Sequence, residues 1–308
     1  MIEPGDPAPL FVAPTEAGQD FYLSSAAGDH VVLTFVDGRI VVSLPAADHV
    51  VPDDGGVIAA RYGLAGVRRT VVLDARLRVL DTMPVTDATR LADALAVRED
   101  GTAPHLVVPR VLEPELCRRL VAEYDRVGGA DSGFVRGDEH GRTVPVVDHT
   151  HKRRRDVTLT DPALRAAVRT RLERRLGPEL RKAFQFTATR VERYLVACYD
   201  AADGGHFRPH RDNTTGGTAH RAFAVTINLN AGYTGGDLRF PEFGPRTYRA
   251  PLGGALVFSC SLLHEVLPVT EGRRYCTLPF LYDEVGEELR KRNLAFVAGP
   301  VADPDPEL

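Results

Sequence analysis

The sequence predicts an α+β protein with two domains. The first, over residues 1–100, is expected to be a small thioredoxin-like α/β domain, and the second, over residues 101–308, a jelly roll (double-stranded β-helix) with buttressing helices. Buried-strand and helix patterns alternate in the first part, whereas short strand patterns separated by glycine turns fill the chain from Phe186 onward. A length of 308 residues with 44% hydrophobic content is enough for two globular cores.

The domain boundary is predicted near residue 100 from charge and from loop-forming residues. Residues 1–100 are acidic overall, whereas residues 101–308 are slightly basic. The join at residues 98–104 is polar and contains glycine and proline, which is typical of a linker.

The N-terminal domain is predicted from an order of strand, helix, hairpin and helix. The expected elements are a buried strand at 31–36, a short helix at 57–62, paired strands at 69–74 and 77–81, and a helix at 86–97 capped by Thr86. This order is typical of the thioredoxin-like fold.

Short motifs in this domain resemble the peroxiredoxin family. They are Pro4-Gly5-Asp6-Pro7-Ala8-Pro9, the strand at Val31, Arg61-Tyr62-Gly63, and the run from Arg69 to Asp74. Peroxiredoxins attack peroxide with a cysteine thiolate, but residues 1–100 contain no cysteine, and part of the family's layout is missing between Val36 and Arg61. We therefore expect a truncated scaffold without peroxidase chemistry, which packs on the second domain, recruits substrate or dimerises.

Two amphipathic helices and a long loop are predicted between the N-terminal domain and the strands that begin near Phe186. One helix starts at Pro114, and another follows the cap Asp161 over residues 162–176. Residues 131–156 show no periodicity and are expected to form a lid or binding loop. The basic run at 149–156 is either a contact for an anionic substrate group or a solvated stretch that begins a strand.

The jelly roll is predicted from short strands that end with a helix at 284–292. Gly235-Gly236 and Gly253-Gly254 supply turns between them. The expected strands are 189–198, 223–229, 237–240, 246–249, 255–258, 263–269 and 275–282.

A His-x-Asp pair and one distant histidine are the strongest candidate site in the chain. His210, Asp212 and His264 have the residue types of the two-His-one-carboxylate triad, which binds Fe(II) on one face and leaves positions open. Two imidazoles alone would suit zinc equally well, and an isolated His-x-Asp is usually surface chemistry.

An arginine follows His264 at a spacing that fits a strand, a turn at Glu271-Gly272 and a returning strand. The guanidinium of Arg274 could then face the same pocket as His264. Arginine pairs bidentately with carboxylates, and a two-oxoacid that chelates iron needs such a partner at its other carboxylate.

With these residues in place, the chain resembles the Fe(II)/2-oxoglutarate-dependent dioxygenases of the prolyl-4-hydroxylase-like branch. The likeness covers roughly residues 185–283. It rests on six ordered blocks: Val196-Ala197-Cys198-Tyr199, His210 with Asp212, Ile227-Asn228-Leu229-Asn230, Gly235-Gly236-Asp237-Leu238-Arg239-Phe240, Gly253-Gly254-Ala255-Leu256-Val257-Phe258, and His264 through Tyr275.

The resemblance assigns a role to each site residue. It implies that His210, Asp212 and His264 bind iron and that Arg274 binds the distal carboxylate of 2-oxoglutarate. Tyr199 matches a tyrosine that hydrogen-bonds the co-substrate near the metal. Asn228 stands where relatives often carry tyrosine. Arg273 is the rival of Arg274, because some relatives have a shorter step.

The implied activity is hydroxylation of an unactivated C–H bond, with Fe(II), 2-oxoglutarate and O2 as cofactor and co-substrates and ascorbate as a candidate accessory reductant. Succinate and CO2 would be released. The substrate would be a prolyl or other amino-acid side chain, or a small metabolite. The alternative is a non-catalytic protein that binds metal and 2-oxoglutarate as a sensor or adaptor.

Composition excludes other classes of partner. A net charge of −4 and a pI near 6.2 provide no electrostatic footprint for nucleic acid. The sequence has no apolar leader and no run of 18 apolar residues, so no membrane association is expected. Four scattered cysteines predict reduced thiols in a cytoplasmic protein. A homodimer is an open possibility.

Overall fold

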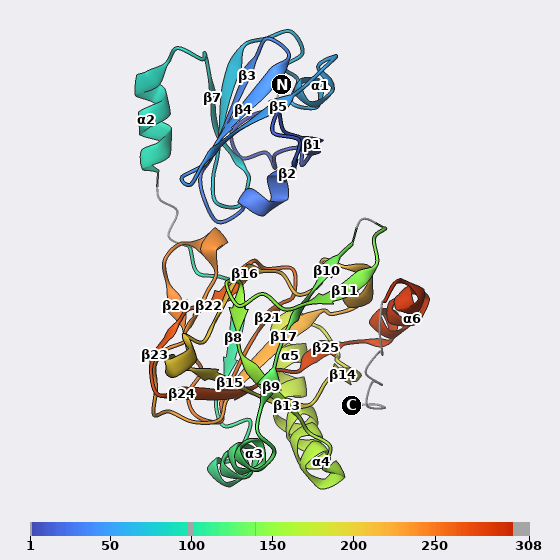
Figure 1. The fold of residues 1–308 in the computed structure, drawn as a ribbon. Coiled ribbons are helices and arrows are strands. Elements are labelled where there is room, and N and C mark those ends of the chain that lie inside the picture. Colours follow the sequence, from blue (N-terminus) through green and yellow to red (C-terminus); the bar gives the residue numbers. More distant parts are fainter. Residues whose placement is uncertain (1, 98–100, 139, 298–308) are drawn as a thin grey trace. The chain divides into compact units, whose positions relative to one another are not determined.

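The computed structural model describes residues 2–97, 101–138 and 140–297 (Figure 1). The chain divides into two compact units. One comprises residues 1–103 together with 240–246, and the other comprises residues 104–239 and the chain from Thr247 onward.

The N-terminal unit contains a five-stranded sheet in the order β5-β4-β3-β6-β7. In the central strand β3 (Val31–Val36), Val31, Leu33 and Phe35 are buried and alternate with partly exposed residues, as expected for a strand that packs one face on a core. The other strands are β4 (Arg39–Ser43), β5 (Asp48–Pro52), β6 (Arg69–Leu73) and β7 (Val79–Met83), and a separate β1–β2 hairpin joins Val12–Pro14 to Asp20–Tyr22.

Strands β4 and β5 were not expected from the sequence. Asp37 and Gly38 both have positive φ and connect β3 to β4 as a tight hairpin, for which Asp-Gly is the usual signal. An α/β domain contains parallel strands, whereas every pairing described in this sheet is antiparallel. The antiparallel pairing thus gives no support to the predicted α/β topology. The thioredoxin-like and peroxiredoxin-like assignment is not confirmed and stays a prediction.

Both predicted helices of this unit are present. Helix α1 spans Val57–Arg61 and α2 spans Ala88–Ala96. The predicted cap of α2 was wrong by one residue: the side chain of Asp87, rather than Thr86, accepts the backbone N–H of Arg90.

The C-terminal unit contains two main sheets, in agreement with the predicted jelly roll. The five-stranded sheet has the order β12-β16-β22-β19-β20, with β12 (Lys152–Arg153), β16 (His206–His210), β22 (His264–Val266), β19 (Leu238–Arg239) and β20 (Thr247–Tyr248). The nine-stranded sheet contains β14 (Arg190–Glu192), β25 (Phe280–Tyr282), β17 (Phe223–Asn228), β24 (Arg273–Thr277), β15 (Leu195–Asp200), β13 (Arg155–Thr158) and β9 (Ala130–Asp131) along one path, and β21 (Ala255–Ser259) links β17 to β8 (His105–Val108).

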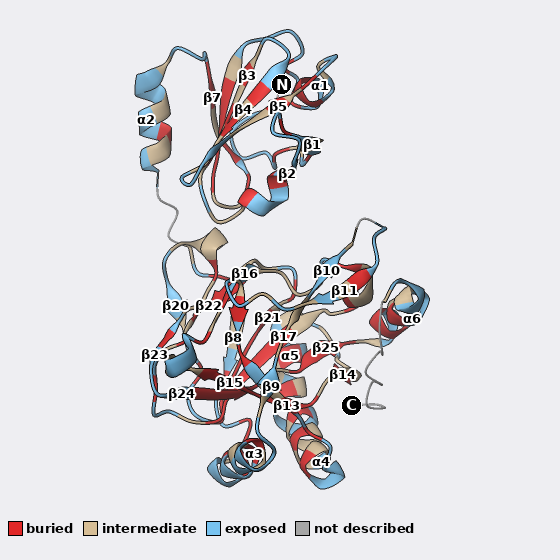
Figure 2. Ribbon diagram, viewed as in Figure 1, coloured by how far each residue is buried: buried red, intermediate tan, exposed pale blue. Residues whose placement is uncertain are grey.

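Helices cover the large sheet, and buried residues concentrate on its central strands (Figure 2). Helix α3 (Pro114–Val127) buries Leu116, Leu120 and Tyr124. The predicted helix at 162–176 is α4 (Pro162–Arg171), capped by Asp161, followed by a π-helical turn at Leu172–Leu176 and by α5 (Gly177–Phe184). Helix α6 spans Glu284–Asn293. Among the described residues, no helix combines the length and apolar character needed to cross a membrane.

The predicted loop at 131–156 contains several short strands. They are the hairpin β10 (Phe134–Gly137) and β11 (Thr143–Val146), followed by β12 and the first half of β13. The expectation of an irregular segment was wrong because these strands are stabilised by cross-strand pairing rather than by an apolar repeat of their own.

Candidate metal and co-substrate site

The two sheet strands β16 and β22 bring His210 and His264 together. The two residues are register partners, and Asp212 lies two positions beyond the end of β16. His210 Nε2 lies 3.7 Å from Asp212 Oδ1, and His264 Nε2 lies 3.3 Å from Asp212 Oδ2. One ligand atom from each residue falls within 4.8 Å of the other two. The structure thus places the three predicted ligands at one point.

Backbone hydrogen bonds orient both imidazole rings. His210 Nδ1 lies 2.7 Å from the carbonyl oxygen of Arg208, and His264 Nδ1 lies 3.0 Å from that of Leu262. Because a carbonyl oxygen only accepts, each Nδ1 carries the proton, so that Nε2 is the ring nitrogen with the lone pair that can bind a metal. This second contact of the ring is the usual arrangement for a metal-binding histidine.

Aromatic rings enclose the histidines. The ring of Phe207 stacks on His210 with centroids 3.5 Å apart, and Phe258 meets His264 edge-on at 4.6 Å. Burial, with the nearby His264, lowers the pKa of His210 well below its usual value. A neutral imidazole is the form that binds a metal.

Arg274 lies buried on β24 with one nitrogen atom unsatisfied. Its Nε donates to Asn228 Oδ1 (3.1 Å), and its Nη2 donates to Thr226 Oγ1 (2.9 Å). Its Nη1 is buried and has no hydrogen-bond partner in the described part of the chain. Arg274 lines the same pocket as His210, Asp212 and His264. An orphaned buried guanidinium nitrogen beside the ligand cluster fits a site for a carboxylate.

Tyr199 lines the same pocket from the neighbouring strand β15. It is a register partner of Arg274 and is almost fully buried. Its hydroxyl accepts a long hydrogen bond from Arg154 Nη1 (3.5 Å), and burial raises the pKa of the phenol. Asn228 also belongs to the site, but through Arg274, which it holds in position while donating its own N–H to the carbonyl of Ala250 (2.7 Å).

Arg273, the rival anchor, points elsewhere. Its side chain is 59% exposed and its Nε donates to Asp200 Oδ2 at 2.6 Å. Successive side chains of a strand face opposite sides of the sheet. Arg274 therefore lies in the pocket, whereas Arg273 does not line it.

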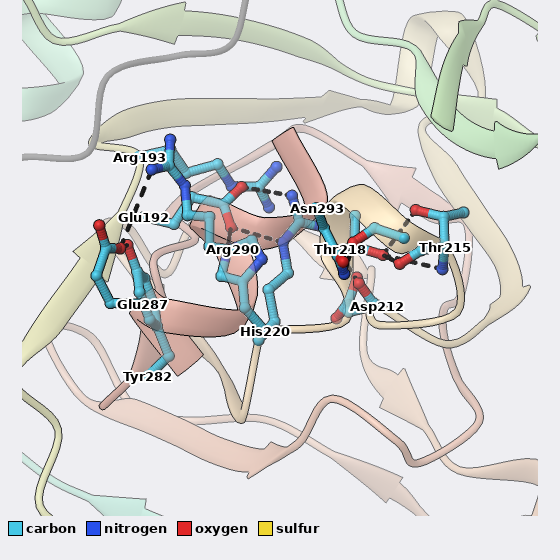
Figure 3. Close-up of polar contacts among 12 residues, drawn as sticks. Glu192, Arg193, Asp212, Thr215, Thr218, His220, Tyr282, Glu287, Arg290 and Asn293 are labelled. Atoms are coloured by element: carbon cyan, nitrogen blue, oxygen red, sulfur yellow. Dashed lines mark hydrogen bonds and ion pairs between the residues drawn. The ribbon is translucent and has the colours of Figure 1, made fainter. Parts of the chain in front are cut away.

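The sequence did not indicate a network of charges that supports Asp212. Arg221 Nη1 donates to the backbone carbonyl of Asp212 (3.2 Å), and its guanidinium forms a bidentate pair with Glu192. His220 Nε2 lies 2.9 Å from Oε2 of the same Glu192 carboxylate (Figure 3). No local spacing connects Glu192 with residues 220–221, so only the fold could reveal the network.

Comparisons with known proteins agree with this geometry. Residues 194–282 match the model of the 2OG-Fe(II) oxygenase superfamily. A PKHD-type hydroxylase of Synechococcus sp. (strain JA-2-3B'a(2-13)) is 28% identical over 98 residues, covering 30% of this chain and 43% of that protein. A PKHD-type hydroxylase of Azoarcus sp. (strain BH72) is 29% identical over 143 residues, covering 43% and 60%.

The chain is also similar to two solved structures. A prolyl hydroxylase from Trichoplax adhaerens, in complex with a hypoxia inducible factor peptide fragment, matches with a TM-score of 0.46 and 17% identity, covering 61% of this chain and 87% of that one. A Pseudomonas putida prolyl-4-hydroxylase matches with a TM-score of 0.44 and 20% identity, covering 63% and 97%.

The matched segment is a 2OG-Fe(II) oxygenase domain. It contains all six predicted site residues, which are Tyr199, His210, Asp212, Asn228, His264 and Arg274. Proteins of this superfamily use Fe(II), 2-oxoglutarate and O2, and the His-Asp-His cluster provides the matching ligand types. The chain spans 43% and 60% of the lengths of the two curated relatives.

Proposed function

We propose that this protein is an Fe(II)- and 2-oxoglutarate-dependent hydroxylase. It would hydroxylate an unactivated C–H bond and release succinate and CO2. The observation that carries the proposal is one pocket that contains both the converging ligand atoms of His210, Asp212 and His264 and the unsatisfied Nη1 of Arg274. A metal site and a carboxylate anchor side by side are what a chelating two-oxoacid requires.

Each side chain has a definable task in this proposal. His210, Asp212 and His264 would hold the iron, which together with 2-oxoglutarate and O2 supplies the oxidising chemistry. Arg274 would pair with the distal carboxylate, while Asn228 and Thr226 fix the guanidinium and remove its freedom to turn. Tyr199 would donate its hydroxyl proton to the co-substrate. Phe207 and Phe258 lie against the two imidazoles and would shield them from water.

The proposed substrate is a prolyl or other amino-acid side chain, or a small metabolite. The description of two relatives as PKHD-type hydroxylases supports the hydroxylase part of this proposal.

For the N-terminal unit we propose a non-enzymatic role as a truncated peroxiredoxin-like scaffold over residues 1–100, ahead of an oxygenase domain over 101–308. The compact units change over at Ala103 and Pro104, close to the proposed boundary. Four buried free thiols, all outside residues 1–100, support a protein that works in the cytoplasm.

The decisive experiment measures succinate from the full-length protein. Fe(II), 2-oxoglutarate and O2 are added, and uncoupled turnover is followed without substrate and then with pooled amino acids, peptides and metabolites. We expect slow succinate formation that a subset of the pool accelerates, and none from Asp212→Ala. Tight binding of metal and 2-oxoglutarate without any succinate would instead identify a sensor or adaptor, and near-normal turnover in Asp212→Ala would contradict the proposed site.

A further inference from the structure

A second cavity opens beside the metal-ligand pocket. It has a volume of about 280 Å³ and shares with that pocket the residues Arg154, Arg193, Phe207, His210, Asp212 and Phe280. Its apolar wall consists of Phe134, Val135, Pro145, Phe207 and Phe280. Arg274, Tyr199 and Thr226 do not line it. The cavity therefore reaches the metal ligands from a side different from the carboxylate anchor described above.

The charged residues that line this cavity are almost all basic. They are Lys152, Arg154, Arg193, Arg211 and Arg221, and the acidic one is the metal ligand Asp212. Two of the arginines are neutralised by neighbours, because Arg154 pairs with Asp156 at 2.6 Å and Arg221 pairs with Glu192. A divalent cation on Asp212 would add to the positive charge.

Arg193 differs from these two arginines. Its Nε donates to the carbonyl of Leu278 (3.0 Å), and its guanidinium carbon lies 4.3 Å from the centre of the Phe280 ring. Throughout residues 2–97, 101–138 and 140–297, no carboxylate forms an ion pair with it. Arg193 also has a left-handed backbone conformation (φ 59°), which costs free energy in a residue other than glycine.

The surroundings of Arg193 disfavour its charge. Burial, with the nearby charges of Arg154 and Arg221, lowers its pKa to about 10, while the more weakly acting carboxylates of Glu192 and Asp156 oppose part of this shift. Arg221 also lies against the Phe280 ring, at 4.1 Å. A partly buried guanidinium that lacks a counter-ion and sits between like charges is stabilised when an anion enters.

Lys152 adds a polar side chain to this wall, although burial lowers its pKa to about 6 and leaves the amine largely neutral at pH 7. Its Nζ donates to Ser132 Oγ at 2.8 Å and to the carbonyl of Gly133 at 2.5 Å. Lys152 belongs to the basic run at residues 149–156. One of the two predictions for this run was a contact with an anionic substrate group. The structure places Lys152 and Arg154 of that run on the cavity.

We propose that this cavity is the substrate site and that the substrate is a small carboxylic acid with an apolar body, whose carboxylate pairs with Arg193. The phenylalanine, valine and proline side chains would pack on the apolar body and hold its C–H bonds beside His210 and Asp212. This inference rests on the proposed function and specifies the substrate class. It separates two anion positions: 2-oxoglutarate at Arg274 and the substrate carboxylate at Arg193.

The test uses pairs of probes that differ in one negative charge. N-acetyl amino acids with apolar side chains and their primary amides are titrated calorimetrically into the full-length protein, with Mn(II) in place of Fe(II) and saturating 2-oxoglutarate. At least one acid should bind about tenfold more tightly than its amide, as expected for a charge-assisted hydrogen bond. Arg193→Gln should abolish this preference and Arg193→Lys should retain part of it.

Arg273→Gln is the matched control, because Arg273 is an exposed arginine already paired with Asp200. It should keep the full preference for acids. Equal binding of acid and amide by the unmodified protein, no binding by any acid, or an unchanged preference in Arg193→Gln would each overturn the inference. So would a loss of 2-oxoglutarate affinity in Arg193→Gln as large as that in Arg274→Gln, because Arg193 would then belong to the co-substrate.

The two proposals can fail separately. Binding of Mn(II) and 2-oxoglutarate is measured first, and its absence would count against the proposed function. The acid and amide titrations are then repeated on metal-free protein, where the charge on Arg193 still discriminates between them. Circular dichroism of each variant verifies that the fold is retained.

Discussion

Tyr199 and Arg274 are register partners across strands β15 and β24, with the guanidinium carbon of Arg274 5.5 Å from the centre of the tyrosine ring. Both side chains line the metal pocket. The next residue back along β24, Arg273, is oriented to the other side and pairs with Asp200. Because successive side chains of a strand face opposite sides of the sheet, Arg274 and not Arg273 faces the metal pocket.

Arg274→Ala should raise the 2-oxoglutarate requirement sharply. In Arg274→Ala the distal carboxylate of bound 2-oxoglutarate would lose its buried partner, and such a loss costs about 3–5 kcal/mol. In Arg273→Ala only the exposed pair with Asp200 is lost, and an exposed pair contributes about 1 kcal/mol or less. Titration of the Mn(II)-loaded variants with 2-oxoglutarate measures the difference. A larger loss of affinity in Arg273→Ala would show that the wrong arginine has been assigned.

Alanine at His210, Asp212 or His264 should abolish iron binding and succinate formation while leaving the fold intact. These side chains converge on one point, but the β16–β22 ladder is held by backbone pairing. Metal content after dialysis and the thermal unfolding of metal-free protein give the two readouts. His206→Ala, which changes a partly buried histidine of the same strand, should bind iron normally.

Lys152 should make stability depend on pH. Burial, with the charge of Arg154, lowers its pKa from 10.5 to about 6. Between these values the unfolded chain binds a proton that the folded chain does not, so the free energy of unfolding should rise with pH. In urea titrations between pH 6.5 and 9.5, Lys152→Met should lack this increment. Lys182→Met, at an 80% exposed position, should follow the unmodified protein. Parallel curves for Lys152→Met and the unmodified protein would show that Lys152 is not responsible.

The protein should show no thiol-dependent peroxidase activity. Residues 1–100 contain no cysteine, and all four thiols of the chain are buried. Burial raises the pKa of Cys117 to about 11 and that of Cys198 to about 12, so little thiolate exists at neutral pH. Peroxide consumption with dithiothreitol should equal the buffer rate, and a thiol reagent should titrate all four cysteines only after unfolding. Rapid peroxide reduction by native protein would refute this.

Residues with a strong local signature could be placed from the sequence. The ligand set, the turn at Gly272 and the cap Asp161 each rest on a short pattern, and the structure shows all three. The β3–β4 and β10–β11 hairpins were missed, although Asp37-Gly38 is a turn signal that could have found the first. Their strands are defined by pairing with a neighbouring strand, which the periodicity of a single segment does not reveal.

The supporting charges could not have been predicted for the same reason. Glu192 on β14 meets Arg221 in the loop before β17, and Arg193 reaches the cavity beside Asp212. Each of these contacts depends on how strands from separate parts of the chain are arranged. Periodicity describes one segment at a time and carries no information about such neighbours.

The pairing of β16 with β22 also determines when a metal could first be held. His210 and His264 are separated in sequence by a long segment that includes β17, β19 and β21, and they become neighbours only when β16 pairs with β22. In the unfolded chain Asp212 and His264 are far apart in sequence, so the complete set of three ligands is not assembled there. Iron would then bind a finished scaffold and raise its melting temperature by mass action. Iron loading would then be a late step in the maturation of the protein.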